Sequence, residues 1–302
     1  MKIGYPCINR SLGCSSSKTF RLKSYSENLL IEKINNNLDC LLKILKYNRE
    51  HNILFFRISS DLIPFASHPV CTYDWKKQFK EKIKNIGYFI RENQIRISMH
   101  PDQFTLINSP DEDIFKRSKR ELQYHADILA LMGLDSSAKI QIHVGGVYGD
   151  KEKSITRFIK RYKKLSKKIK EHLVIENDEK SYCLADCLNL SARINIPVLF
   201  DVFHHSLYNN KESLKAAFVL FSKTWSLRDG VPLVDYSSQA QAKRSGSHTE
   251  SIDLNDFTGF IKEVEKFDFD LMLEIKDKEK SVLKVMHKLK LSGKTKKTTK
   301  KA

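Results

Sequence analysis

The chain has 302 residues, of which 41% are hydrophobic, and it carries a formal net charge of +17. No apolar run approaches the ~20 residues that cross a bilayer, and the start, MKIGYPCINR, lacks the charged and apolar regions of a secretory signal. We therefore expect an intracellular protein, neither secreted nor membrane-bound. A chain this basic usually binds a polyanion, most often nucleic acid.

Eight short runs rich in Ile, Leu, Val and Phe predict buried β-strands. They lack the strict polar–apolar alternation of a sheet that faces water on one side, which favours strands covered on both faces. In chain order they are 2–6, 53–59, 94–100, 139–144, 172–177, 197–202, 231–237 and 269–276.

Longer amphipathic stretches between these runs predict helices. The first, 26–51, places its apolar residues on one face and begins at Ser26, a suitable N-cap. The others are 73–93, 113–134, 151–170, 181–193, 211–224, 253–266 and 277–291.

This alternation of eight strands with eight helices predicts an α/β fold, a single (β/α)8 TIM barrel. Length alone leaves two domains open, and a doubly wound open sheet is the alternative fold. A doubly wound fold usually has a glycine-rich phosphate loop after its first strand, and the segment GYPCINRSLG does not match that motif. We expect the barrel to span 1–290.

The C-terminal segment 291–302 is expected to be a basic, disordered tail. From Lys288 onward the chain holds seven lysines and no acidic residue, so the remainder keeps +10 of the net charge. A solubilising end and a nucleic-acid contact are both open for this tail. The basic remainder favours DNA or RNA as the partner.

The six cysteines predict reduced, intracellular thiols. They form no CxxC pair and match no zinc framework; their positions are 7, 14, 40, 71, 183 and 187.

Ionisable side chains follow six consecutive strands at their C-terminal ends, where the active sites of such barrels lie. One such residue alone is more often structural, so the prediction depends on six strands agreeing. Imidazoles and carboxylates together suit divalent metals, and their number exceeds the needs of one ion, which predicts two or three ions sharing carboxylates. The residues are His100, His143, Glu176, Asp201, His204, His205, Asp235, His248 and Glu274.

A set of motifs across about residues 1–290 resembles the UV damage endonucleases. The motifs are GYPC, RISSDLIPFASHP (57–69), MHPDQF (99–104), HVGGVYGDKE (143–152), IEND (175–178), DVFHH (201–205), YSSQ (236–239) and KRSGSH (243–248). The resemblance implies a TIM barrel that nicks double-stranded DNA immediately 5′ to a UV photoproduct, a cyclobutane dimer or a 6–4 product. Such an enzyme would start an alternative excision repair, and we expect it to be a monomer.

The resemblance also implies divalent metal ions, usually manganese, with magnesium, cobalt or zinc as alternatives. Glu176 would bridge two ions. The ligands that carry over, which are also the implied catalytic residues, are His100, His143, Glu176, Asp201, His204, His248 and Glu274.

Substrate contacts are expected around the same end of the barrel. The resemblance makes Tyr5 a substrate residue and Gln103–Phe104 the pair that probes the flipped lesion. Asn9, after the first strand, is placed to contact the extruded bases, and His68 stands in the matching PFASHP motif. Basic residues of the loops could pair with phosphates, although each could equally be a solvated surface charge: Lys151, Lys243 and Arg244.

The chain departs from the family pattern in two respects. On the seventh strand the family often has a carbamylated lysine and, two residues later, a histidine; this chain has Leu233 and Asp235. Leucine cannot be a ligand, whereas aspartate can, so a third ion either binds weakly or uses His204 and Asp235 with water. The family's aromatic probe is commonly tyrosine, and Phe104 keeps the stacking surface without the hydroxyl.

Three other classes of function remain open. An abasic-site endonuclease uses the same type of metal barrel, but PFASHP and MHPDQF favour the UV enzymes. A sugar isomerase or epimerase acts on small neutral substrates, for which a charge of +17 gives no advantage. A non-catalytic DNA-binding protein leaves the metal-ligand residues at the strand ends unexplained.

Overall fold

The computed structural model describes residues 1–299, with side chains described through residue 290. Its strands pair in parallel and in chain order, and β8 pairs with β1, so the sheet closes into a barrel. The chain is a TIM barrel, and all eight predicted strands are confirmed. They are β1 (Ile3–Pro6), β2 (Phe55–Ile58), β3 (Arg96–Met99), β4 (Lys139–His143), β5 (Leu173–Glu176), β6 (Val198–Asp201), β7 (Leu233–Tyr236) and β8 (Asp270–Leu273).

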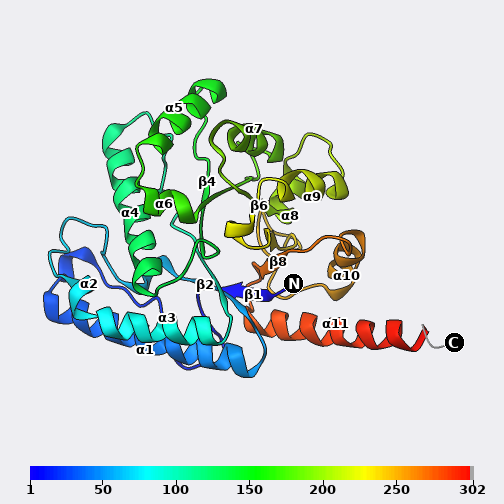
Figure 1. Cartoon of the computed structure of the whole chain (residues 1–302), viewed down its shortest axis with the longest axis horizontal. Helices are drawn as coiled ribbons and strands as arrows, with labels where there is room; N and C mark the ends of the chain where they lie inside the picture. Colours follow the sequence, from blue (N-terminus) through cyan, green and yellow to red (C-terminus); the bar gives the residue numbers. More distant parts are fainter. Residues whose placement is uncertain (300–302) are drawn as a thin grey trace.

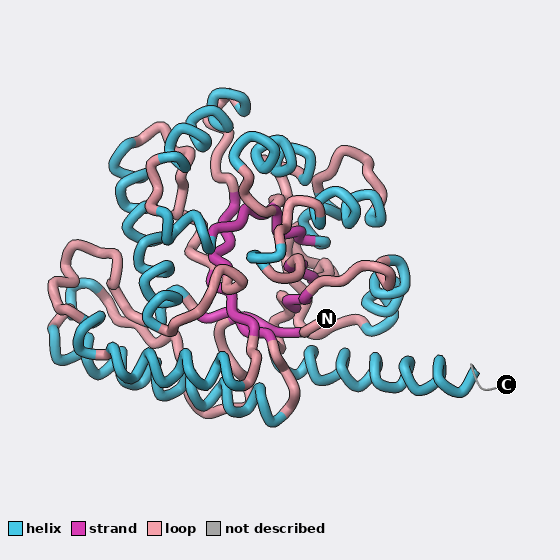
Figure 2. The backbone as a smooth tube through the Cα atoms, in the orientation of Figure 1, coloured by secondary structure: helices cyan, strands magenta, loops and turns pink. Residues whose placement is uncertain are grey.

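Helices surround this barrel, whose strands lie at the centre of the molecule (Figure 1 and Figure 2). They are α1 (Glu27–Glu50), α2 (Trp75–Gln78), α3 (Lys80–Glu92), α4 (Glu112–Leu131), α5 (Lys151–Lys163), α6 (Lys167–His172), α7 (Leu184–Ile194), α8 (Val202–Leu207), α9 (Leu214–Ser222), α10 (Leu254–Glu263) and α11 (Glu279–Thr299). Short 3-10 turns cover Leu22–Ser24, Ser60–Leu62 and Leu227–Asp229. No described helix combines the length and the apolar character that crossing a membrane requires.

Every predicted helical stretch contains helix. Ser26 caps α1 as expected, because its hydroxyl accepts a hydrogen bond from the Leu29 amide at 3.3 Å. Two stretches are each divided into two helices, α2 with α3 and α5 with α6. Sequence reasoning missed α8, which at six residues is too short to show helical periodicity.

The apolar core has two parts. The larger part packs the outer face of the strands against the helices. A smaller cluster fills the barrel interior and consists of Phe55, Val174, Leu199, Leu233 and Met272. Leu233 therefore contributes to packing, while Asp235, two residues further along β7, lies on the same face of the strand and nearer its C-terminal end.

The cysteine prediction is wrong for one pair. Cys14 and Cys40 form a disulfide, with their Cα atoms 5.9 Å apart. The segment after β1 folds back against α1 and brings together two residues that are 26 positions apart, which spacing alone could not reveal. The other cysteines are free thiols, as predicted: Cys7, Cys71, Cys183 and Cys187.

The C-terminal helix α11 leads away from the barrel and continues to Thr299 (Figure 1). The expected boundary at residue 291 falls within this helix, where side chains are no longer described. The division into a barrel and a tail stays a prediction, and residues 300–302 lie outside the described part of the chain.

Candidate metal centre

Strand register brings the predicted ligands to one level of the barrel. His143 at the end of β4 pairs with Glu176 at the end of β5, and Asp201 at the end of β6 pairs with Asp235 of β7. Neighbouring parallel strands thus present their last side chains at the same edge, which we call the C-terminal rim. The ligand candidates from β4 to β7 meet there, although they are far apart in the sequence.

A first group that could hold a metal ion consists of His100, His143 and Glu176, which each offer a ligand atom within 4.8 Å of the others. Nε2 of His100 lies 3.5 Å from Oε2 of Glu176, and Nε2 of His143 lies 3.8 Å from the same oxygen. Nδ1 of His100 lies 2.6 Å from the carbonyl oxygen of Pro101, so the ring is oriented by its backbone contact.

A second group consists of Glu176, Asp201 and His204. Nδ1 of His204 lies 3.3 Å from Oε1 of Glu176 and 3.7 Å from Oδ2 of Asp201. The two oxygens of Glu176 thus face different groups, Oε2 towards the first and Oε1 towards the second. A carboxylate placed in this way could bridge two ions, and that role of Glu176 stays a prediction.

The helix α8 determines where the side chains of the DVFHH motif lie. Asp201 caps this helix, and its Oδ1 accepts a hydrogen bond from the His204 amide at 2.7 Å. The turn directs His204 towards Glu176. His205 instead packs its ring against Phe200, with 5.0 Å between the ring centres. Of these two adjacent histidines, His204 belongs to a described group that could hold a metal ion and His205 does not.

A third group consists of Asp201, Asp235 and Glu274. Two of its buried oxygens, Oδ2 of Asp201 and Oδ1 of Asp235, have no hydrogen-bond partner among the described residues. Buried carboxylate oxygens without a donor are costly unless a cation or a proton satisfies them. The donor set of the C-terminal rim therefore fits divalent cations.

Sequence reasoning missed two residues at the centre of this network. Arg57 of β2 binds Asp235 at 2.6 Å and also donates to Glu274. Gln141 of β4 accepts from Arg57 and donates to Oε2 of Glu176 and to Oδ2 of Asp235, each at 2.8 Å. The signal was an arginine inside the apolar run ILFFRIS, because a buried guanidinium must have an anionic partner.

Asp235 is therefore not a free ligand. Its Oδ2 is held by Arg57 and Gln141, and only Oδ1 remains without a partner among the described residues. Its predicted role as a metal ligand stays a prediction that now concerns this one oxygen.

The carboxylates and imidazoles perturb one another's protonation. Burial raises the pKa of Asp235 to about 7 against the opposing effect of Arg57. Burial opposes ionisation of Glu274 as well, but there Arg57 prevails and lowers the pKa to about 2. Burial alone would lower the pKa of His204, yet Asp201 and Glu176 raise it to about 11. Without a metal ion, the neighbouring carboxylates therefore favour the protonated form of His204, and burial favours the protonated form of Asp235.

His248 lies beside Glu274 but outside the three groups. Its Nδ1 lies 3.8 Å from Oε2 of Glu274 and 2.8 Å from the carbonyl oxygen of the same residue. The backbone contact holds the ring next to the candidate ligand. Its predicted role as a ligand stays a prediction.

The predicted probes Gln103 and Phe104 lie exposed in the turn after β3, and 72% of Phe104 is accessible. His68 is also exposed. Tyr5 and Asn9 are buried instead: the Asn9 amide donates to the Tyr5 hydroxyl at 2.8 Å, and that hydroxyl donates to Asn48 at 2.6 Å. The substrate roles of all these residues stay predictions.

The three predicted phosphate contacts differ in their surroundings. Nζ of Lys151 donates to Asp186 at 2.8 Å and to the Tyr208 hydroxyl at 3.3 Å, so it is already engaged. Lys243 lies 3.5 Å from Glu250, and Arg244 is exposed. Lys243 also lines a cavity of about 420 Å³ whose wall includes His248 and Glu274.

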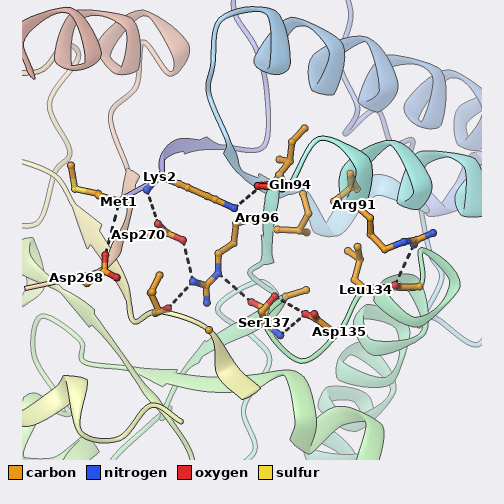
Figure 3. Close-up of a pocket in the computed structure, with 17 residues that line it drawn as sticks. Met1, Lys2, Arg91, Gln94, Arg96, Leu134, Asp135, Ser137, Asp268 and Asp270 are labelled. Carbon is orange, nitrogen blue, oxygen red and sulfur yellow. Dashed lines mark hydrogen bonds and ion pairs between the residues drawn. The ribbon is translucent and has the colours of Figure 1, made fainter. Parts of the chain in front are cut away.

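A larger cavity of about 660 Å³ lies at the opposite end of the barrel (Figure 3). Its polar wall includes Arg96 and Asp270, the first residues of β3 and β8, which bind each other at 3.1 Å. Asp270 also accepts from the Lys2 amide at 2.6 Å. These charges are already paired, and the N-terminal end of a TIM barrel serves stability, so this cavity is not the functional site.

A family model described as UV-endonuclease UvdE matches residues 1–302. The chain belongs to this family. It is 43% identical over 297 residues to the UV DNA damage endonuclease of Clostridium perfringens, covering 98% of this chain and 72% of that protein. Family membership makes the chain a UV-damage endonuclease, whose substrate is DNA.

Solved structures agree with this assignment. The crystal structure of SacUVDE superimposes with a TM-score of 0.93 at 46% identity, covering 97% of this chain and 99% of that one. Endonuclease IV from Thermus thermophilus superimposes with a TM-score of 0.54 at 14% identity, covering 78% of this chain and 87% of that one, which shows a shared fold alone.

Proposed function

We propose that this UV-damage endonuclease uses divalent metal ions to nick one DNA strand immediately 5′ to a cyclobutane dimer or a 6–4 product. The observation that carries the proposal is the position of Glu176, whose two oxygens face the two imidazole-containing groups. One ion would be held by His100, His143 and Glu176, and a second by Glu176, Asp201, His248 and Glu274. Manganese is our first choice of metal.

These residues would hold ions that could supply Lewis acidity towards the phosphate and lower the pKa of water. The chain's own contribution is to fix the ligands. The Asn177 side chain donates to the backbone oxygen of Asp201 and accepts from the Asp201 backbone amide, each at 3.0 Å. The backbone carbonyl oxygen of Asn177 lies 3.0 Å from Nδ1 of His204. The Arg57–Gln141 network does the same for Glu176 and Glu274. A third ion would depend on His204 and Oδ1 of Asp235.

We propose that the exposed turn after β3 recognises the lesion. A photoproduct stacks and pairs poorly, so extruding it costs less than extruding normal bases. Phe104 exposes a flat apolar ring that could fill the gap in the duplex, and Gln103 beside it offers hydrogen bonds. We propose that the protein acts in this way as a monomer inside the cell.

An incision assay tests the proposal against its rivals. The purified protein and Mn²⁺ are incubated with end-labelled duplexes that carry a cyclobutane dimer, a 6–4 product, an abasic site or no lesion. We expect a nick at the phosphodiester directly 5′ to each photoproduct, and none after EDTA treatment. Incision of abasic DNA alone would establish the abasic-site alternative, and activity on ketoses with no DNA cleavage would establish an isomerase.

A further inference from the structure

Lys278 combines features that set it apart from the other lysines near the metal centre. It lines the cavity of about 420 Å³ that also exposes His248 and Glu274. It lies four residues after Glu274, directly before α11, and adopts a left-handed backbone with φ of 57°. A non-glycine residue pays strain in that region, and such strain concentrates at functional positions.

The ammonium of Lys278 is not directly bonded to any group in the described part of the chain, although Glu274 and Cys7 act on it electrostatically. No described residue forms a hydrogen bond or an ion pair with its Nζ, although the residue is only partly exposed. Burial lowers the pKa of Lys278, and nearby Cys7 and Glu274 act in the opposite direction. Glu274 is itself engaged by Arg57. Burying a cation without a directly bound anion costs free energy, so Lys278 is favourably placed to bind an anion from outside the chain.

The other two lysines of the cavity differ in this respect. Nζ of Lys276 lies 2.7 Å from Oε1 of Glu250, and Nζ of Lys243 lies 3.5 Å from the same oxygen. Their charge is already partly neutralised within the protein. Lys278 is therefore the cavity lysine that is left to bind an external anion.

The turn that carries Lys278 is held from both sides. On one side Glu279, fully buried, accepts hydrogen bonds from the Arg10 amide at 2.9 Å and the Ser11 hydroxyl at 2.8 Å. On the other side the Lys276 and Asp277 amides donate to the backbone oxygens of Thr249 and Glu250. The backbone of Lys278 is thus fixed relative to the loops that follow β1 and β7, as a pre-organised ligand site requires.

We propose that Lys278 is a positioning residue that binds a non-bridging phosphate oxygen of the incised strand, within one nucleotide of the incision. The inference rests on the proposed nicking function, because that function places a phosphodiester beside His248 and Glu274. A lysine beside the metal centre would fix the strand by a charge-assisted hydrogen bond and hold the phosphate for attack.

The test pairs a lysine variant with a phosphate variant. Duplexes with a cyclobutane dimer carry one uncharged methylphosphonate, moved through the phosphates around the incision. Affinity is measured by fluorescence anisotropy in Ca²⁺, and incision in Mn²⁺ under single turnover. Lys278→Gln is compared with Lys276→Gln, which changes the same charge in the same cavity but removes a lysine that Glu250 already engages.

We expect one methylphosphonate position to weaken wild-type binding by about tenfold, because it removes one charge-assisted hydrogen bond to the protein. Lys278→Gln should show the same loss on unmodified DNA, a salt slope reduced by about one, and no further loss at that position. Lys276→Gln should keep the wild-type sensitivity. Lys278→Arg, which preserves the charge, should restore most of the affinity.

Two results would overturn the inference. One is a Lys278→Gln protein that keeps wild-type sensitivity at every phosphate. The other is a loss of thermal stability in Lys278→Gln without any change in phosphate sensitivity, which would make the lysine a structural counter-charge to Glu274. If the wild type incised no duplex, the proposed function would fail, while the affinity scan would still decide the role of Lys278.

Discussion

Nη2 of Arg57 lies 2.6 Å from Oδ2 of Asp235, inside the barrel and beside the metal-ligand candidates. Both side chains are almost fully buried. The same guanidinium also binds Glu274, so one fixed cation holds two of the three carboxylates of the third group. Part of the negative charge at this rim is therefore neutralised by the chain itself.

Arg57→Met should destabilise the metal-free protein by about 3–5 kcal/mol, because it leaves buried carboxylates without their cation. Urea unfolding in EDTA measures this loss. Arg49→Met is the matched control, since Arg49 is exposed and bonds only Asn93 among the described side chains; it should change stability by less than about 0.5 kcal/mol. Equally small losses in both variants would contradict a structural role for the buried pair.

Glu176→Gln should reduce incision by about 10²–10³-fold or more while leaving DNA affinity within about threefold. The amide keeps the shape but removes the charge that faces both imidazole groups, so metal binding should fall as well. Metal content by mass spectrometry and incision of a dimer-containing duplex measure both effects. Glu171→Gln is the control, because Glu171 lies just before the N-terminal end of β5, whereas Glu176 is at its C-terminal end. Full incision activity of Glu176→Gln would contradict the proposal that Glu176 bridges two ions.

Stability should depend on pH in opposite directions with and without metal. His204 binds a proton more tightly in the folded protein, with its pKa raised from 6.5 to about 11. Its contribution is therefore fully present below pH 6.5 and is lost as the pH rises towards 11. The pKa of Asp235 is raised from 3.8 to about 7 in the folded protein. Its contribution to the stability is therefore present below pH 3.8 and is lost as the pH rises from 3.8 to about 7.

If His204 and Asp235 bind a third ion as we propose, Mn²⁺ displaces these protons, and its affinity should rise about tenfold per pH unit for each proton displaced. We expect the Mn²⁺-induced increase in Tm to grow between pH 6 and 8.5. Thermal unfolding in EDTA and in Mn²⁺ at several pH values measures the difference. His204→Asn should flatten the trend, and a metal-induced shift that is the same at every pH would contradict the assignment.

Phe104→Ala should weaken lesion-specific incision by about 10–100-fold, the range for losing one aromatic contact with a base. Stability should not change, because 72% of Phe104 is exposed. Tyr88→Ala is the control, since Tyr88 is 58% exposed on α3, away from the turn after β3. Incision of dimer-containing and undamaged duplexes by both variants separates a probe from a general DNA contact. An equal loss in both variants would contradict the probe role.

Most of the fold could be predicted from the sequence because hydrophobic periodicity reports local burial. The eight apolar runs coincide with the strands, and Ser26 caps α1 as expected. What failed was either short or non-local. The six residues of α8 carry no periodic signal, and the Cys14–Cys40 bond depends on how the segment after β1 folds back.

By itself the sequence determined which residue types stand at the strand ends, because strand length and chain order fix that placement: His100, His143, Glu176, Asp201 and Glu274 meet in the structure as expected. Only the tertiary structure decided their partners. It turned His204 inward and His205 away, and it set Arg57 on Asp235. It also left Nζ of Lys278 without a hydrogen bond or ion pair among the described residues. The reason is physical: side-chain pairing inside a closed barrel depends on register across strands, and register is a property of the whole sheet.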